Sequence, residues 1–177
     1  MRWLAFTTML SLDLGRLGRE GSVLVEARLP ADAPLWEGSN IAWAGPVGVR
    51  LNVTNAGTGE IVVRGTVEGA VALECRRCLE PVVGSVEQEV TIVFVAADTP
   101  GAEDDDGTYL FESSGELDVS RALREEVLLA VNSYVVCRPD CQGFCPTCGV
   151  NRNTDSCACE EDEADPRWEA LRALKNR

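Results

Sequence analysis

The fold is decided by residues 60–73 (EIVVRGTVEGAVAL) and residues 82–95 (VVGSVEQEVTIVFV), two segments rich in Val and Ile. From Thr66 to Val71, polar or small residues alternate with Val and Gly, which is the period-two pattern of a half-buried strand. A Cys-x-x-Cys pair, Cys75 and Cys78, follows the first segment. We therefore predict two β-strands with a cysteine pair after the first.

Two further strands are predicted before this pair, at residues 23–29 (VLVEARL) and 47–54 (VGVRLNVT). Residues 30–46 are rich in Pro, Gly, Asn and Trp, so we expect a loop there. The turn formers of residues 55–59 (NAGTG) suit a hairpin. Because these connections are too short for a crossover helix, we expect antiparallel pairing.

One long helix is predicted at residues 118–131, with Asp118 or Ser120 as its cap. Its apolar residues recur at steps of four, and three consecutive ones widen the face that should pack on the sheet: Val119, Leu123, Val127, Val131, then Leu128, Leu129 and Ala130. The stretch before it, 98–107, carries three consecutive Asp and is expected to be a solvated loop. A short C-terminal helix is predicted after Asp165-Pro166.

The predicted fold class is α+β, with an antiparallel β-rich core, one long packed helix and a Cys-rich, zinc-binding C-terminal module. We expect a core domain over residues 1–136 and a zinc module over residues 137–177. Hydrophobic residues make up 45% of the chain, enough for a core. An integral membrane protein is excluded because no run of 18 or more apolar residues occurs.

The chain contains eight Cys but no His. The absence of His excludes a Ser-His-Asp or Cys-His device and any His-ligated catalytic zinc. We therefore expect a protein that is not an enzyme and has no small-molecule substrate. Residues 1–10 are apolar enough to suggest a signal peptide, but two Thr interrupt them and no small-x-small cleavage site follows. We expect a cytoplasmic protein, in which paired cysteines point to metal rather than disulfides.

Six cysteines lie within 23 residues near the C-terminus, and the segment 145–149 (CPTCG) has the form of a zinc knuckle. In such a knuckle, two Cys separated by two residues hold one tetrahedral metal, and the Gly permits the backbone turn. We predict one or two structural zinc ions, with eight candidate ligands: Cys75, Cys78, Cys137, Cys141, Cys145, Cys148, Cys157 and Cys159.

The spacing leaves the division of these ligands open. One partition joins the last four cysteines and leaves the first four for a second zinc. The rival pairs the two knuckles, Cys75/Cys78 with Cys145/Cys148, and a single occupied zinc with free thiols is a third possibility. A thioredoxin-type dithiol is the redox alternative, but it requires a helix N-terminus after the first Cys, and Pro81 opposes one.

These motifs together resemble the YceD-like family of large ribosomal RNA subunit accumulation proteins, over nearly the whole chain. The matching stretches are residues 12–14, 19–21, 74–81 (ECRRCLEP), 137–153 (CRPDCQGFCPTCGVNRN), Cys157, Cys159 and 165–168 (DPRW). The resemblance implies a non-enzymatic factor that supports accumulation of large-subunit rRNA. Some family members lack the C-terminal cysteines, which implies that metal stabilises the fold rather than performing the shared function.

Three positions depart from the family pattern. Residues 131–133 (VNS) stand where the family usually has a Leu-Pro step, Arg152 stands where it commonly has Leu between two Asn, and residues 1–8 have no obvious counterpart.

The expected partner is large-subunit rRNA or a large-subunit ribosomal protein. The net charge of -13 opposes RNA binding, because RNA binders normally present a basic surface. The acidity is local, however: residues 98–118 carry eight acidic side chains, residues 160–165 carry five, and the rest is balanced. Four Arg near the cysteines are the candidate contacts to nucleic acid: Arg76, Arg77, Arg138 and Arg152. The alternative is an acidic, chaperone-like partner of basic ribosomal proteins.

Overall fold

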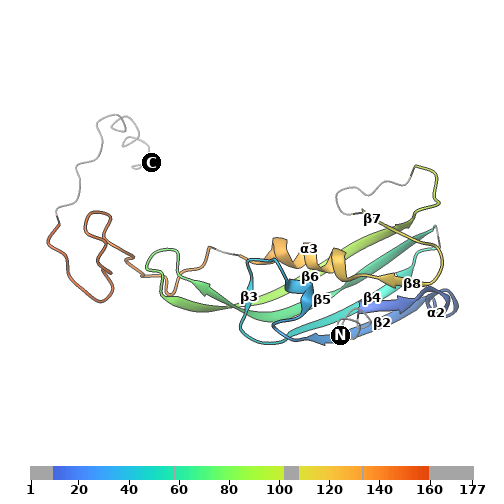
Figure 1. Cartoon of the computed structure of the whole chain (residues 1–177), viewed down its shortest axis with the longest axis horizontal. Helices are drawn as coiled ribbons and strands as arrows, with labels where there is room; N and C mark the ends of the chain where they lie inside the picture. The colour runs from blue at the N-terminus through green and yellow to red at the C-terminus, as the bar shows by residue number, and fades with distance from the viewer. Residues whose placement is uncertain (1–9, 58, 102–107, 133, 160–177) are drawn as a thin grey trace, which may run out of the picture.

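A computed structural model describes residues 10–57, 59–101, 108–132 and 134–159. Its main feature is a long six-stranded sheet with the order β2-β4-β5-β6-β7, and β3 pairs with β5 beside β4 (Figure 1). The bounds of these strands are β2 Ser22–Leu29, β3 Ala42–Trp43, β4 Val47–Asn55, β5 Glu60–Glu74, β6 Pro81–Ala96 and β7 Thr108–Phe111. The predicted α+β class is correct.

The four strands predicted from the sequence are present within one or two residues of their expected ends. β5 and β6 form a hairpin whose pairing runs without interruption from Glu60↔Val95 to Glu74↔Pro81. This hairpin extends beyond β4, which pairs with β5 only as far as Glu68. The first cysteine pair is therefore held at the tip of the hairpin, away from the centre of the sheet (Figure 1).

The prediction of a purely antiparallel sheet was wrong at one edge. β7 runs parallel to β6, with Val93 opposite Thr108 and Ala96 opposite Phe111. The chain leaves β6, passes through residues 97–107 and returns to pair in the same direction. Parallel pairing requires a longer connection than a tight turn, and this segment supplies it without a helix among its described residues.

The helix α3 (Ser120–Ala130) lies against one face of the sheet, within the predicted range 118–131 (Figure 1). Its buried residues are Ala122, Leu123 and Val127, and Val119 just before it is also buried. Leu129, expected on the packed face, is 85% exposed, so that part of the prediction was wrong. The Asp118 carboxylate accepts a hydrogen bond from the Ser120 backbone N–H at 2.9 Å, but the N-cap residue is Val119, which makes no side-chain cap bond, so the prediction of Asp118 or Ser120 as the cap was wrong.

The N-terminal strand, the helix that follows it and the strand that pairs with it were not predicted. β1 (Ser11–Asp13) pairs with β8 (Glu116–Asp118), and α2 (Leu14–Glu20) follows β1 directly. Helix α2 ends at Gly21, whose φ of +74° suits a left-handed C-cap. These elements have three to seven residues, too few for a recognisable periodicity of apolar residues. The sequence therefore showed only a polar stretch with spaced Leu residues.

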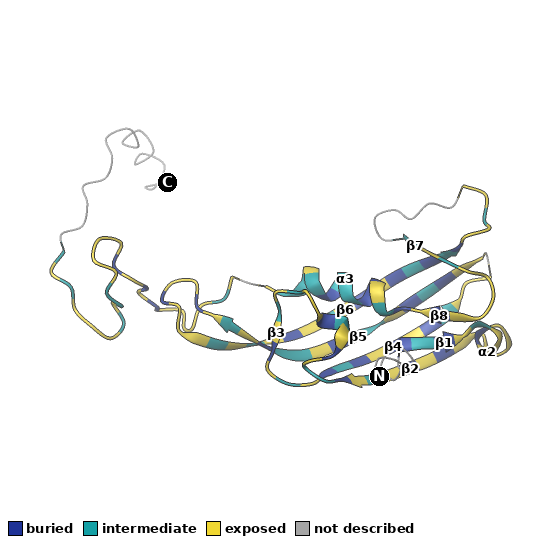
Figure 2. Cartoon of the chain, viewed as in Figure 1, coloured by how far each residue is buried: buried dark blue, intermediate teal, exposed yellow. Residues whose placement is uncertain are grey.

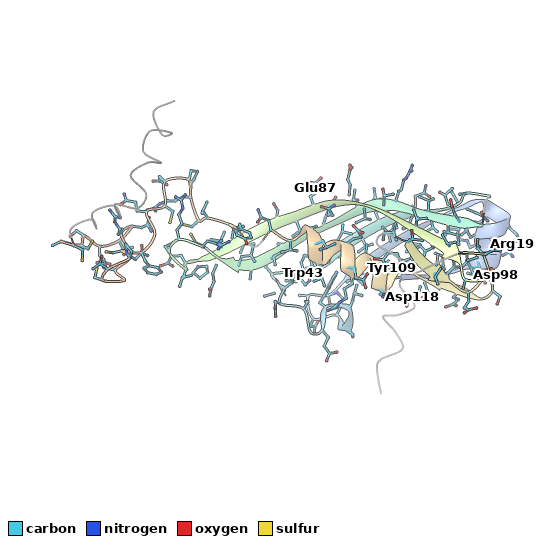
Figure 3. The ribbon with its side chains drawn as sticks, turned by 90° about the horizontal axis from the view of Figure 1, so that it is seen from above. Arg19, Trp43, Glu87, Asp98, Tyr109 and Asp118 are labelled. Atoms are coloured by element: carbon cyan, nitrogen blue, oxygen red, sulfur yellow. The ribbon has the colours of Figure 1, made fainter. Side chains whose placement is uncertain are left out.

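The loop predicted at residues 30–46 contains the short 3-10 helix η2 (Pro34–Trp36) and β3. Trp36 and Trp43 are both buried, with ring centroids 5.0 Å apart. A Cβ at Gly69 would lie 2.6 Å from the Trp43 ring, so glycine is required for the indole to cover β5 (Figure 3). The loop thus contributes two packed indole rings to the core.

The core lies between the sheet and the elements that cover one of its faces, and it consists almost entirely of Val, Leu and Ile (Figure 2). None of the described polar or charged residues is buried. No described helix combines the length and the apolar character needed to cross a lipid bilayer. The acidic run 160–165, the predicted C-terminal helix and most of the predicted acidic loop lie outside the described residues.

Candidate metal centres

The first cysteine pair forms a compact turn at the tip of the β5–β6 hairpin. The Cys75 N–H donates to the Glu80 carbonyl at 2.9 Å, which continues the strand ladder by one pair. The Leu79 N–H donates back to the Cys75 carbonyl at 2.8 Å. Leu79 adopts φ +57°, the left-handed region that favours glycine. Both sulfurs of the pair are thereby held on the same side of the turn.

The predicted knuckle at residues 145–149 has the same backbone. The Cys145 N–H donates to the Val150 carbonyl at 2.8 Å, and the Gly149 N–H donates to the Cys145 carbonyl at 2.9 Å. Gly149 has φ +72° and occupies the place that Leu79 has in the first turn. The sequence identified the second turn from its glycine, whereas the matching role of Leu79 carried no such signal.

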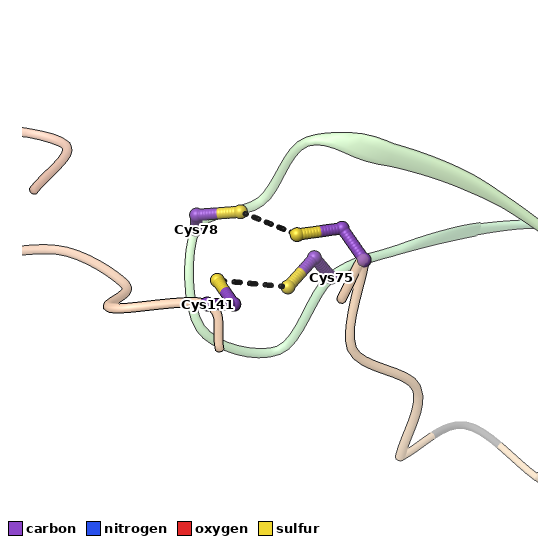
Figure 4. A group of neighbouring side chains, drawn as sticks. Cys75, Cys78 and Cys141 are labelled. Atoms are coloured by element: carbon purple, nitrogen blue, oxygen red, sulfur yellow. Dashed lines mark hydrogen bonds between the residues drawn. The ribbon is translucent and has the colours of Figure 1, made fainter. Parts of the chain in front are cut away.

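The eight cysteines gather into two groups of four. Within each group, all sulfurs lie within 4.8 Å of one another: Cys75, Cys78, Cys137 and Cys141 in the first cluster, and Cys145, Cys148, Cys157 and Cys159 in the second. This is the first of the two partitions that the spacing allowed, and the pairing of the two knuckles around one metal was wrong. The first cluster joins the hairpin tip to the segment that leaves α3 (Figure 4).

The sulfur positions fit a tetrahedral metal ion. The Cys75 and Cys141 sulfurs are 3.8 Å apart, and the Cys78 and Cys137 sulfurs are 3.6 Å apart (Figure 4). A metal bound to four thiolates at about 2.3 Å requires sulfur–sulfur edges of about 3.8 Å. A disulfide would require about 2.05 Å. The first cluster therefore has the geometry of a four-thiolate metal centre.

Protonation in the first cluster is uneven. Burial opposes ionisation of Cys75, but backbone N–H groups of Cys137, Arg77 and Cys78 act on its sulfur and lower its pKa to about 6. One of these donors, the Arg77 N–H, lies 3.4 Å from that sulfur. Desolvation, followed by hydrogen bonds with Cys141, Cys78 and Cys75, raises the pKa of Cys137 to about 12. Four thiolates can thus coexist here when a cation balances their charge.

The second cluster shows the same division. Backbone N–H groups of Cys148 and Thr147 lower the pKa of Cys145 to about 6. Hydrogen bonding with the Cys148 thiol, followed by desolvation, raises the pKa of Cys159 to about 12. Each cluster therefore contains at least one thiol with a lowered pKa, which ionises readily, and at least one with a raised pKa, which keeps its proton unless a metal displaces it.

Asn153 connects the two clusters. Its side-chain NH2 group donates to the Cys141 sulfur at 3.5 Å and to the side-chain oxygen Oδ1 of Asn151 at 2.8 Å. Its own side-chain oxygen accepts from the Gln142 N–H at 2.9 Å. A metal-ligating sulfur usually has such an outer partner, which fixes its orientation. The sequence contained this residue in the family motif but did not reveal its role.

Gly143 permits a close backbone approach beside the same link. Its φ is +68°, and a Cβ there would lie 2.7 Å from the Arg77 carbonyl oxygen. That carbonyl accepts the Phe144 N–H at 2.9 Å, so the second module is hydrogen-bonded to the hairpin turn directly. The two clusters are thus joined through backbone as well as through Asn153.

The four candidate Arg residues lie around these clusters but have different environments. The Arg76 guanidinium carbon lies 3.8 Å from the ring centroid of Tyr134. Arg77 donates to the Cys141 carbonyl at 2.9 Å, and Arg138 pairs with Asp140 at 3.3 Å and donates to Asn153 at 3.0 Å. Arg152 is exposed. Two of the four guanidinium groups therefore bind other parts of the module.

Exposed apolar residues surround this region, and sequence analysis did not single them out. Tyr134 is 73% exposed and Leu79 is 58% exposed, while Phe144 is 39% exposed. They come from three separate segments, so no local pattern could have marked them. Arg76 lies over the ring of one of them, Tyr134, so an exposed aromatic ring and a guanidinium group lie together beside the first cluster.

Comparison with known proteins places these residues in a family. A sequence profile described as "Large ribosomal RNA subunit accumulation protein YceD" matches residues 63–175, which include both clusters. An uncharacterized protein of Mycobacterium tuberculosis is 31% identical over 169 residues, covering 92% of this chain and 79% of the relative.

A maize protein named "Large ribosomal RNA subunit accumulation protein YCED homolog 1, chloroplastic" is 28% identical over 144 residues, covering 65% of this chain and 49% of that protein. No solved structure matches the chain. On the profile match and the mycobacterial identity, the chain belongs to the YceD family.

Proposed function

We propose that this protein is a non-enzymatic ribosome-biogenesis factor that supports accumulation of large-subunit rRNA by binding rRNA or a large-subunit ribosomal protein. The observation that carries the proposal is the family match over residues 63–175, the part of the chain that holds the hairpin, α3 and both clusters. The name of the maize relative, a large ribosomal RNA subunit accumulation protein, supports the same process. The protein would act in the cytoplasm, without a membrane.

We further propose zinc as the metal of both clusters, one ion in each. Four-thiolate donor sets with pairs of closely spaced cysteines favour zinc, which has no redox chemistry and adopts tetrahedral coordination in structural sites. Such a site has no open position for substrate, so its role is structural. This arrangement agrees with a sequence that lacks His. The zinc ions would hold the module as one rigid binding surface.

The surface best suited to RNA is the aromatic and cationic face of the module. Proteins bind single-stranded RNA by stacking bases on aromatic rings and on Arg planes. Tyr134 and Phe144 provide exposed rings, and Arg76 already lies over the Tyr134 ring at 3.8 Å. A few stacked bases would require fewer phosphate contacts than a duplex does, which suits a chain with a net charge of -13.

The test is a paired substitution, Arg76→Ala with Tyr134→Ala, in the full-length protein. We expect binding to fragments of large-subunit rRNA, measured by filter binding at physiological salt, to fall at least tenfold. Cells carrying this variant should accumulate less large-subunit rRNA. Arg64→Ala, at an exposed position in the middle of β5, is the matched control and should bind like the parent protein. Unchanged binding by the paired variant would remove this surface from the proposal.

The second candidate function is an acidic, chaperone-like partner of basic ribosomal proteins. The local acidity of residues 98–118 and 160–165 favours it, because these runs would attract Lys- and Arg-rich chains over long range. Neutralising both runs should then abolish recovery of ribosomal proteins in a pull-down at low salt. Recovery of rRNA alone, unaffected by the neutralisation, would reject this candidate.

A further inference from the structure

One edge of the main sheet has no partner strand. β6 pairs with β5 along its whole length, but β7 covers its other side only from Val93 to Ala96. Among the described residues, no strand pairs with the outer edge of β6 from Pro81 to Ile92. An unpaired edge of this length can accept another extended chain.

The hydrogen bonds at both ends of β6 define which backbone groups point outward. Glu80 accepts from Cys75, and Ala96 donates to Gly59, so these even-numbered positions face β5. Because neighbouring residues of a strand alternate in direction, the odd-numbered positions direct their N–H and C=O groups to the free edge. They are Val83, Ser85, Glu87, Glu89 and Thr91.

Two features reduce the number of backbone groups on this edge that can pair with another strand. Pro81 stands at an outward position, where a missing N–H leaves the β5 ladder intact. The Gln88 side chain donates to the Glu89 carbonyl at 2.7 Å. Between them, Val83, Ser85 and Glu87 retain both groups for a partner. This stretch of about five residues spans about 17 Å.

A groove runs beside this stretch, with a volume of about 440 Å³. The strand edge forms one wall, and the end of α3 with the segment after it forms the other. The apolar lining residues come from both sides: Val71, Leu73 and Val86 from the hairpin, and Ala130, Val131 and Val135 from the other wall. A strand added to β6 would therefore place alternate side chains on an apolar floor.

The charges at this groove favour a basic occupant. Among the described residues that line it, Glu87 is the one charged residue. Its exposed side chain lies on the face of the sheet away from Val86 and α3 (Figure 3). Glu87 stands directly opposite Glu68 in the ladder, a like-charge pair that destabilises a sheet. A Lys or Arg on the same face of an added strand would lie beside Glu87 and relieve this repulsion.

We propose that this groove binds an extended segment of a partner protein in which apolar residues alternate with Lys or Arg. The segment adds to β6 as a strand, with main-chain hydrogen bonds to Val83, Ser85 and Glu87. Its apolar side chains lie near Val86 and its basic side chains near Glu87. The proposal goes beyond the RNA surface, since the groove shares no residue with Arg76, Tyr134 or Phe144.

The test uses a fluorescein-labelled nine-residue peptide of alternating Val and Lys, added to the full-length protein. We expect saturable binding by anisotropy, at least tenfold tighter than that of the same peptide with Glu in place of Lys. Amide exchange measured by NMR should slow at least tenfold at Val83, Ser85 and Glu87. The amides of β2, the opposite edge of the sheet, serve as the internal control and should not change.

Two substitutions separate the two parts of the recognition. Ser85→Pro removes an outward N–H without touching the β5 ladder and should abolish peptide binding while circular dichroism and metal content stay unchanged. Glu87→Gln keeps the backbone donors. It should weaken binding of the Lys peptide by about threefold to tenfold and leave binding of the Glu peptide no weaker. If both variants bind the Lys peptide like the parent protein, the proposal is wrong.

Two further results would overturn it. The first is equal slowing of exchange on β2 and β6, which would indicate non-specific association. The second is that the amides at positions 83, 85 and 87 are already protected in the free protein and become unprotected when residues 160–177 are removed. That result would assign the groove to the chain's own C-terminal segment instead of a partner.

Discussion

The two cysteine clusters have identical ligands but different surroundings. In the first cluster, Cys75, Cys78 and Cys141 are buried, at 0%, 3% and 3% exposure. In the second, only Cys145 is buried, Cys148 is exposed, and an open cavity of about 750 Å³ lies alongside. The first cluster joins residues about 60 positions apart, whereas the second lies within residues 145–159. The first cluster is supported by the sheet, whereas the second has little regular structure of its own and would depend on the proposed metal.

This difference predicts a different role for the proposed metal in each cluster. A cluster built on a hairpin tip keeps part of its geometry from β5 and β6, because strand pairing continues to the Cys75–Glu80 hydrogen bond. The second cluster has one isolated bridge, between Phe144 and Asn151, as its regular structure among the described residues. A short segment without a core folds only when metal binding contributes the free energy.

Removal of metal should give the largest effect. We expect a strong chelator at neutral pH to disorder the segment 137–159 while the sheet remains folded, because the sheet has its own apolar core. Structural zinc contributes of order 10 kcal/mol to such a module. Hydrogen exchange with mass spectrometry should show full exchange of that segment and protected β4 and β5. An unchanged exchange pattern after complete metal loss would show that neither cluster depends on metal.

Single ligand substitutions should separate the clusters. Cys75→Ser should remove one metal ion and release the segment 137–141 from the hairpin, leaving the second ion in place. Cys145→Ser should also remove one ion, but it should leave the first cluster closed, since no ligand is shared. Elemental analysis should give one ion per chain in both variants. Loss of both ions in Cys145→Ser would mean that the clusters fold as one unit.

The number of protons released on metal binding should show which thiols are already ionised before the metal binds. Cys75 lies on the hairpin tip, which stays folded without metal, and the backbone N–H groups of Arg77 and Cys78 there keep the pKa of its thiol lowered. The metal ion of the first cluster should then displace fewer than four protons at pH 7.5 and nearly four below pH 6. Calorimetry in buffers of different ionisation enthalpy measures this number. Four protons in both ranges would contradict the lowered pKa of Cys75.

The same shift fixes the sign of a pH effect on the metal-free hairpin tip. The Cys75 thiol, whose pKa falls from 9.0 when unfolded to about 6 when folded, stabilises the folded turn fully above pH 9. That contribution is lost as the pH falls through about 6. Acid should therefore loosen the metal-free turn around Cys75 before it affects the sheet.

The smallest effects should come from the two turn residues. Leu79→Gly relieves a side chain held at positive φ and should stabilise the protein by roughly 0.5 kcal/mol, the left-handed cost less the entropy of glycine. Gly149→Ala introduces that cost and should destabilise the second knuckle by about 1 kcal/mol. Thermal denaturation of the two variants checks the opposite signs. Equal signs would show that the two turns are not equivalent.

The four longest strands and the knuckle turn at residues 145–149 could be predicted because their signals are local. Alternation in residues 60–73 and the C-P-T-C-G turn each depend on neighbours in sequence. The parallel strand β7 could not be predicted, because its four residues carry no mark of direction. Leu129 was wrongly predicted to be buried for a related reason. A run of apolar residues indicates that a helix packs on the sheet, but it does not indicate how wide a stripe of the helix surface is buried.

The sequence by itself determined the antiparallel hairpin, the α+β class and the knuckle at residues 145–149, since strand alternation and turn glycines act over a few residues. The tertiary structure decided the division of the ligands and the role of Asn153. It also decided the stacking of Arg76 on Tyr134 and the free edge of β6. Those features join segments far apart in the chain, and their relative position depends on how long β5 and β6 extend past the core before the chain turns.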